Sequence, residues 1–234
     1  MLKMTNKPVL AVDVDEVIAY FIPALAEFHN EAYGGTLLTA QSFHSYDFCQ
    51  VWGGTIEDSY VKMDGFYASS HFVNLKPIPH AFETLKKLQD DFELHIVTSR
   101  QFAIQDPTLK WVEQHFPNVF TEIHFGNHYS REGKVRSKPE ICRDIGAVLL
   151  IDDSLQYALH CYKADIPVLL FGEYAWNQRE SVCPTNFESC DVSIASFDAE
   201  AHSAALTNPD SSTLYRISHW QQIPQAIRFL LPDV

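Results

Sequence analysis

Three carboxylates follow an apolar run near the start of the chain. The stretch PVLAVDVDEV, residues 8–17, places Asp13, Asp15 and Glu16 at the end of a segment that is typical of a buried strand. Carboxylates this close repel one another, and at the edge of a core they lose hydration. A metal ion, a helix N-terminus or a shared proton would offset that cost, so the stretch indicates a functional site.

Further polar residues follow two other apolar segments. In a parallel sheet the carboxyl ends of the strands meet at one edge, where ligands bind. Clustered oxygen ligands there would suit Mg²⁺. Segment 92–99 ends in Thr98 and Ser99 and is followed by Arg100, and segment 147–153 ends in Asp152 and Asp153. Lys138 is at the start of the helix before segment 147–153, with Lys134 as a rival.

The elements that must position these residues alternate along the chain. Near-continuous apolar runs of this length favour parallel strands covered on both faces, and amphipathic helical segments lie between them. The alternation predicts an α/β fold with a Rossmann-like parallel sheet, flanking helices and right-handed crossovers. The predicted strands are residues 8–14, 92–99, 120–126, 147–153 and 166–172.

One interval interrupts this alternation. Residues 20–75 contain helical patterns and many aromatic residues but no strand candidate, and the interval is too long for a loop. We therefore expect a small helical cap at 20–75 inserted into a core of residues 1–19 and 76–234. Near the C-terminus, 179–212 is expected to be a polar surface excursion, followed by a strand in 212–220 and a helix in 221–231.

Composition narrows the class of protein. The 234 residues carry a net charge of −13, which argues against binding nucleic-acid polymers. No apolar run could span a membrane and no targeting segment is visible, so we expect a soluble, cytoplasmic protein. The five cysteines include no CxxC pair, which fits reduced thiols. The 11 histidines are scattered, so a zinc site is not expected, and His95 and His124 are expected to be core residues.

The ordered motifs resemble those of the haloacid dehalogenase-like (HAD) phosphohydrolases. DVDEV is similar to the first motif, VTSR to the second and LLIDDS to the fourth, and Lys138 matches the third. The helical insert after the first motif resembles the cap of the 5'(3')-deoxyribonucleotidase branch. The branch usually has Gly where this chain has Glu16, which is expected to affect substrate preference more than the chemistry.

The resemblance implies a Mg²⁺-dependent phosphomonoester hydrolase acting through an aspartyl-phosphate. Asp13 would be the nucleophile, and Asp15 the acid that protonates the leaving oxygen and then the base for water. Asp13, the backbone carbonyl of Asp15 and Asp152 would hold Mg²⁺. The residues expected to contact the substrate are Thr98, Ser99, Arg100, Lys138, Phe21 and Trp52.

The substrate is expected to be a small phosphorylated metabolite such as a (deoxy)nucleoside 5'-monophosphate. Phe21, Phe48 and Trp52 would suit stacking on a base, although aromatics at helical spacing also occur in cores. Two alternatives stay open, a non-catalytic HAD-like binding protein and a phosphatase acting on proteins. A homodimer is also left open.

Overall fold

The computed structural model describes residues 7–178, 192–198 and 213–234. These residues form one seven-stranded sheet in the order β3-β2-β1-β4-β5-β7-β6, in which every neighbouring pair is parallel. The expected α/β fold class is therefore confirmed. The strands are β1 Val9–Val12, β2 Glu93–Thr98, β3 Glu122–Phe125, β4 Ala147–Asp152, β5 Val168–Phe171, β6 Ser193–Ser196 and β7 Thr213–Ile217.

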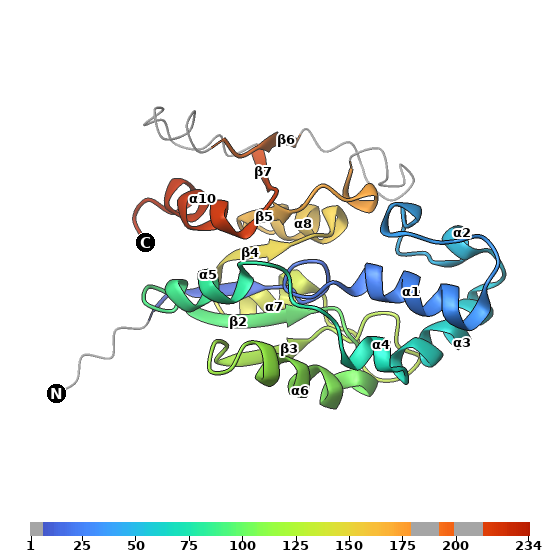
Figure 1. The fold of residues 1–234 in the computed structure, drawn as a ribbon. Coiled ribbons are helices and arrows are strands. Elements are labelled where there is room, and N and C mark those ends of the chain that lie inside the picture. Colours follow the sequence, from blue (N-terminus) through green and yellow to red (C-terminus); the bar gives the residue numbers. More distant parts are fainter. Residues whose placement is uncertain (1–6, 179–191, 199–212) are drawn as a thin grey trace.

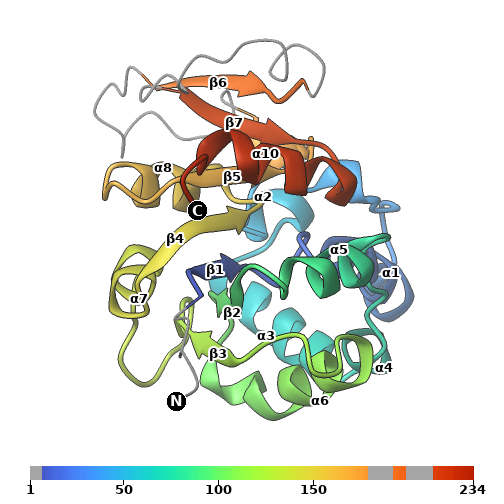
Figure 2. The same ribbon diagram turned by 90° about the vertical axis from the view of Figure 1, so that its left-hand side faces the viewer.

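Helices cover both faces of the sheet (Figures 1 and 2). Alternate strand residues enter two separate apolar clusters, as the two-residue period of a strand requires. Leu10, Leu149 and Ile151 belong to one cluster, and Ala11 and Leu150 belong to the other. The first cluster includes residues of α5 (Ala81–Leu88), α6 (Gln105–His115) and α10 (Ile223–Leu230), and the second includes residues of α7 (Lys138–Asp144) and α8 (Leu155–Tyr162).

The strand register brings the ends of β1 and β4 together. Val12 pairs with Ile151, and the backbone N–H of Asp13 donates to the carbonyl of Ile151 at 3.0 Å. The residues that follow this pair, Asp13 and Asp152, therefore leave the sheet beside each other. This adjacency is the structural basis of the site described below.

The insertion after β1 consists of helices at the carboxyl edge of the sheet, on the right of Figure 1. It leaves and rejoins the core at one place, because Tyr20 N–H donates to the Lys76 carbonyl at 2.9 Å and Ile78 N–H to the Ile18 carbonyl at 2.8 Å. We keep the name cap for residues 20–75; its standing as a separate domain stays a prediction. Its helices are α1 Phe21–Tyr33, α2 Cys49–Trp52, α3 Ile56–Tyr67 and α4 Ser70–Val73, and a 3₁₀ turn, η1, spans Ala40–Ser42.

The C-terminal part adds a strand that the sequence did not indicate. β6, residues Ser193–Ser196, lies within the expected surface excursion and pairs with β7. The rest of the excursion, 179–191 and 199–212, lies outside the described residues. Within the described part of the chain, no helix is long and apolar enough to cross a membrane.

Candidate active site

Lys138 lies between two carboxylates at the ends of adjacent strands. Its Nζ is 2.9 Å from Asp13 Oδ1 and 2.5 Å from Asp152 Oδ2. Lys138 and Asp152 have no solvent exposure, and Asp13 is 6% exposed. Ser137 caps the helix that positions Lys138, since its hydroxyl accepts from Glu140 N–H and Pro139 follows in the first turn. The structure thus selects Lys138 over Lys134 as the cation of this cluster.

Burial controls the electrostatics of the cluster. Loss of hydration raises the pKa of Asp13 to about 7, although the Lys138 ammonium opposes the shift. Burial alone would lower the pKa of Lys138, but Asp13 and Asp152 outweigh it and raise that pKa well above the ordinary value. Lys138 is therefore a fixed positive charge beside Asp13, where an incoming phosphate would need one.

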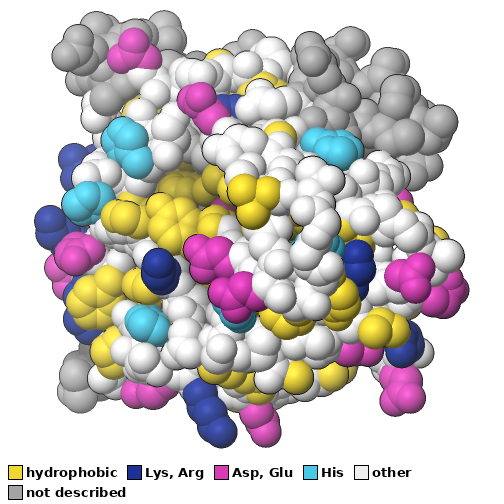
Figure 3. Space-filling view, turned by 45° about the vertical axis from the view of Figure 1, so that its right-hand side comes forward, with side chains coloured by type: hydrophobic (Ala, Val, Ile, Leu, Met, Phe, Trp, Pro, Cys, Tyr) yellow, Lys and Arg dark blue, Asp and Glu magenta, His cyan; other side chains and the backbone are white. Residues whose placement is uncertain are grey.

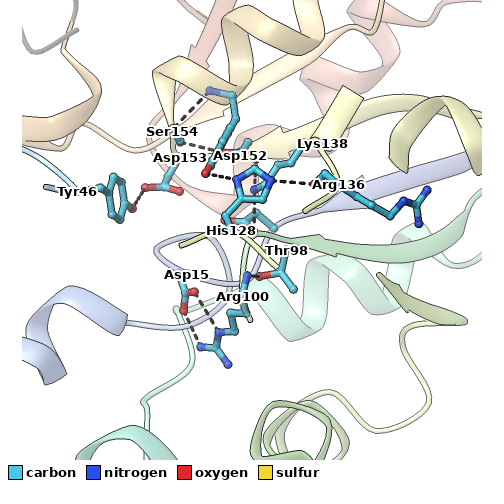
Figure 4. A network of polar contacts seen from close by, with 12 residues as sticks. Asp15, Tyr46, Thr98, Arg100, His128, Arg136, Lys138, Asp152, Asp153 and Ser154 are labelled. Atoms are coloured by element: carbon cyan, nitrogen blue, oxygen red, sulfur yellow. Dashed lines mark hydrogen bonds and ion pairs between the residues drawn. The ribbon is translucent and has the colours of Figure 1, made fainter. Parts of the chain in front are cut away.

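Asp153 connects the core to the cap. Its Oδ2 accepts from Tyr46 Oη at 2.7 Å and from Trp176 Nε1 at 2.6 Å. Tyr46 belongs to the cap, and Figure 4 shows its hydroxyl facing Asp153. Burial, with the charges of Asp152 and Asp13, raises the pKa of Asp153 well above its ordinary value. The helix cap in this stretch is the next residue, Ser154, whose hydroxyl accepts from Tyr157 N–H.

Asp15 is turned toward a guanidinium. Both of its oxygens accept from Arg100, at 3.0 Å from Nε and 2.6 Å from Nη2 (Figure 4). Arg100 is held in turn by the Thr108 hydroxyl at 2.9 Å and lies over the Phe72 ring. Asp15 would have to exchange this pairing before it could reach a leaving oxygen.

Thr98 and Ser99 differ in accessibility. Thr98 is fully buried, and its hydroxyl accepts from Arg100 N–H at 3.2 Å. Ser99 lines the cavity in front of Asp13, although its hydroxyl oxygen is buried, whereas Thr98, Lys138 and Asp152 are not among the lining residues. The phosphate contacts predicted for Thr98 and Ser99 stay predictions.

A cavity of about 780 Å³ opens in front of Asp13. Cap and core residues both line it, and the face that carries the cap shows hydrophobic side chains between charged ones around a hollow (Figure 3). Its aromatic lining consists of Phe21, Tyr46, Phe48, Tyr60, Tyr67, Tyr129, Tyr157 and Trp176. The cavity can thus hold a molecule that is considerably larger than phosphate and has apolar faces.

The two aromatics predicted to contact substrate have different positions. Phe21 lines the cavity but is 5% exposed and packs edge-on against Phe66. Trp52 is not among the lining residues; its ring stacks on His29 at 5.3 Å and its Nε1 donates to Ser59. In this structure the Trp52 ring belongs to the internal packing of the cap, and the substrate contact predicted for it stays a prediction.

Glu16 is buried rather than solvent-facing. Its φ of +56° lies in the left-handed region that favours glycine. This explains why Gly suits the position in the deoxyribonucleotidase branch that the sequence resembles. Here the side chain is 2% exposed, and its Oε1 accepts from Ile22 N–H at 2.6 Å, in the first turn of α1. Burial raises the pKa of Glu16 to about 8. The Glu16 side chain thus serves as the N-terminal capping group of α1, because the residue at the N-cap position, Tyr20, makes no capping hydrogen bond through its side chain.

The acidic cluster fits a hard divalent cation. Carboxyl oxygens of Asp13, Asp152 and Asp153 lie within 4.8 Å of one another, and all three residues are buried. The Lys138 ammonium lies 2.9 Å from Asp13 Oδ1. An all-oxygen donor set of carboxylates is one that suits Mg²⁺.

Sequence reasoning missed Tyr157 and His128 among the residues that line the cavity. Tyr157 lies beneath the Lys138 ammonium, 4.8 Å from the ring centroid, and bonds His128 Nδ1 through its hydroxyl at 2.8 Å. Arg131 stacks over the Tyr60 ring at 4.5 Å, at the cap side of the cavity. Only the position of Tyr157 in the helix after the acidic motif offered a signal for any of them.

Comparison with known proteins agrees with this geometry. Residues 7–156 match the family described as 5' nucleotidase, deoxy (pyrimidine), cytosolic type C protein (NT5C). No curated protein matches the chain.

Solved structures share the fold at low sequence identity. A structure described as a predicted phosphatase from Clostridium acetobutylicum has 12% identity and a TM-score of 0.61, covering 94% of this chain and 98% of that one. A HAD-superfamily hydrolase of subfamily IA from Geobacter sulfurreducens has 15% identity and a TM-score of 0.55, covering 95% and 97%. A haloacid dehalogenase-like hydrolase from Streptococcus pneumoniae has 12% identity and a TM-score of 0.56, covering 76% and 90%.

Proposed function

The chain belongs to the NT5C family of HAD-like 5' nucleotidases and is a phosphoric monoester hydrolase, and from this premise we propose that it cleaves a nucleoside 5'-monophosphate through an aspartyl-phosphate on Asp13. The observation that carries the proposal is the position of Asp13. Its carboxylate lies at the wall of an aromatic-lined cavity, beside the fixed charge of Lys138.

The first step forms a bond between an Asp13 oxygen and phosphorus while the ester P–O bond breaks. Once it has exchanged its pairing with Arg100, Asp15 donates a proton to the departing oxygen and then takes one from the water that attacks the phosphoenzyme. The products are the alcohol and inorganic phosphate, and Asp13 is regenerated. Lys138 would lower the repulsion between the Asp13 carboxylate and the phosphate dianion.

Asp13, Asp152 and the backbone carbonyl of Asp15 would hold Mg²⁺. When bound, the ion would neutralise charge on the nucleophile and the phosphate. Asp153 is better suited to hold the neighbouring groups in place, because its Oδ2 already accepts from Tyr46 and Trp176.

The cavity supports a nucleotide with a planar base. Aromatic faces supply about 1–3 kcal/mol per stacked base. Because the family description specifies deoxy and pyrimidine nucleotides, we place deoxypyrimidine 5'-monophosphates first among the substrates, and a cytosolic location is proposed on the same ground. Cap residues such as Phe48, Tyr60 and Tyr67 enclose the cavity, which favours a small substrate over a phosphoprotein.

A phosphate-release screen tests this proposal. The panel contains deoxynucleoside and ribonucleoside 5'-monophosphates, sugar phosphates and a phosphopeptide, each with Mg²⁺ and with a chelator. We expect Mg²⁺-dependent release, with the highest kcat/KM on nucleotides. Asp13→Asn serves as the matched control, with folding checked by circular dichroism. Equal or higher kcat/KM on sugar phosphates or on the phosphopeptide would contradict the substrate class.

A further inference from the structure

A second group of metal-ligand side chains lies on β2 and β3, away from Asp13. We call four of these residues the histidine cluster: Glu93, His95, Glu122 and His124. The cluster spans the two adjacent strands, and their register pairs His95 with Glu122. Ligand atoms of His95, Glu122 and His124 all lie within 4.8 Å of one another. His95 precedes Thr98 by three residues, which places it about 10 Å along the strand from the catalytic edge.

We propose that the histidine cluster binds a divalent transition metal ion of the zinc class through His95 Nδ1, His124 Nε2 and a Glu122 carboxylate oxygen. The two ring nitrogens are 3.1 Å apart, and His124 Nε2 is 3.4 Å from Glu122 Oε2. Two nitrogens bound tetrahedrally to Zn²⁺ at about 2.0–2.1 Å lie about 3.3–3.4 Å from each other. Two of the three donor separations are therefore already close to those of a tetrahedral site, and water can take the fourth corner.

Glu93 supplies the partner that a metal-binding imidazole usually has. Its Oε1 lies 3.2 Å from His95 Nε2, so it accepts the proton on that nitrogen and leaves the Nδ1 lone pair for the ion. A carboxylate on the far side of a ligand histidine fixes the tautomer and orients the ring. The cluster thus contains both the ligands and the group that prepares one of them.

The charge state of His124 suits ligation. Burial, together with His95, lowers the pKa of His124, so the ring is neutral at physiological pH. In the metal-free arrangement one of the facing nitrogens carries a proton. On binding, His124 would change tautomer: Nδ1 gains a proton as Nε2 loses one, so the ring stays neutral and the Nε2 lone pair is free for the ion. The nearest cation, Arg136, is itself paired with Asp144.

The cluster is open enough for an ion to enter. The His95 and His124 side chains are only 7% and 16% exposed, whereas the Glu122 side chain is 60% exposed. In the sheet as described, β3 is an edge strand, and a bound ion would tie it to β2. No zinc motif is visible in the sequence, because the two histidines lie 29 positions apart on separate strands.

Zinc titration of the metal-stripped protein tests the proposal, with isothermal calorimetry as the readout and excess Mg²⁺ present throughout. We expect one Zn²⁺ per chain, lost in His124→Gln and in Glu122→Gln. Glu122→Gln matters because this exposed side chain can change without disturbing the buried rings. Glu93→Gln should weaken binding about tenfold to a hundredfold, since it removes only the orienting carboxylate.

Two controls separate the histidine cluster from other sites. His71→Gln removes a histidine that pairs with Glu31 at 3.3 Å but has no second imidazole among its described partners, and it should leave Zn²⁺ affinity unchanged. Asp13→Asn should also keep the bound Zn²⁺. X-ray absorption of the zinc-loaded protein should show two imidazole ligands. Absence of binding, or binding that survives in His124→Gln and disappears in Asp13→Asn, would overturn the proposal.

Discussion

At the scale of single residues, the active site is a balance among buried charges. Lys138 has no exposure and pairs with Asp13 and Asp152, which are themselves nearly or fully buried. Breaking a buried ion pair by removing one partner leaves an uncompensated charge and typically costs about 3–5 kcal/mol. We therefore expect Lys138 to stabilise the fold in addition to its proposed role in binding phosphate.

Lys138→Met is expected to lower both the stability of the protein and its turnover rate. The free energy of unfolding should fall by about 3–5 kcal/mol in the absence of Mg²⁺, because two buried carboxylates lose their cation. Turnover should fall by about 10²–10³. Urea unfolding and steady-state kinetics measure the two effects.

A double substitution provides the control for Lys138. Lys138→Met combined with Asp152→Asn removes one of the orphaned charges, so part of the lost stability should return. If the double variant were as unstable as the sum of the two single variants, charge pairing would not be the reason for the loss.

Residue identities at the site followed from the sequence, but side-chain directions did not. Asp13 and Asp152 were identifiable because neighbouring strand ends bring their positions together, and Lys138 because it begins the helix before β4. The pairing of Asp15 with Arg100 and of Trp52 with His29 depends on residues distant in sequence. No local pattern could have indicated either contact.

At the scale of elements, Glu16 joins the catalytic loop to the cap. Its carboxylate caps α1 from the left-handed position that a glycine would occupy more easily. The cap therefore begins on a buried, hydrogen-bonded carboxyl rather than on a flexible hinge. Neither the burial of Glu16 nor its φ was visible in the sequence.

Glu16→Gln is expected to change how stability depends on pH. The pKa of Glu16 is about 8 in the folded state, against an ordinary value of 4.5, because burial disfavours its charge. Between these values the folded state binds more protons than the unfolded state, so Glu16 lowers stability as pH rises. The variant should gain stability over the wild type across this window, by at most about 1.4 kcal/mol per pH unit.

Urea unfolding of both proteins from pH 4 to pH 9 measures this difference. Gln keeps an acceptor oxygen for the Ile22 amide, so the helix cap is retained in the variant. Below the ordinary pKa the two proteins should differ little in their pH slope. Parallel stability curves over the whole range would show that Glu16 is ionised at its usual pKa.

Tyr46→Phe is expected to loosen the contact between cap and core. The hydroxyl donates to Asp153 at 2.7 Å, and burial raises the pKa of Tyr46 well above its ordinary value, so it stays a donor. Leaving a buried hydrogen-bonding group without its partner costs about 1–3 kcal/mol. Backbone amides of η1 and α2 should therefore exchange at least about fivefold faster, as measured by hydrogen–deuterium exchange.

Tyr60→Phe is the matched control for Tyr46. Tyr60 also belongs to the cap and lines the cavity, but its contact with Arg131 is made by the ring and not by the hydroxyl. Exchange in η1 and α2 should match the wild type in this variant. An equal effect of the two substitutions would mean that the Tyr46–Asp153 bond does not hold the cap.

At the scale of the whole molecule, the order of the strands explains the site. β1 and β4 are neighbours at the middle of the sheet, and the helical insertion after β1 lies over their carboxyl ends (Figure 1). The apolar runs predicted this core because buried parallel strands have near-continuous apolar sequences. β6, with the sequence SIAS, is short and half-exposed, so it carries no such signal.

The central claim is that Asp13 carries the phosphoryl group between the two steps. Its most direct test uses Asp15→Asn with p-nitrophenyl phosphate, whose leaving group needs no acid, so that phosphorylation proceeds while hydrolysis of the phosphoenzyme is slowed. A rapid-quench experiment should show a burst of one nitrophenolate per enzyme, and mass spectrometry should find the phosphate on Asp13. No burst, or phosphate on another residue, would contradict the account.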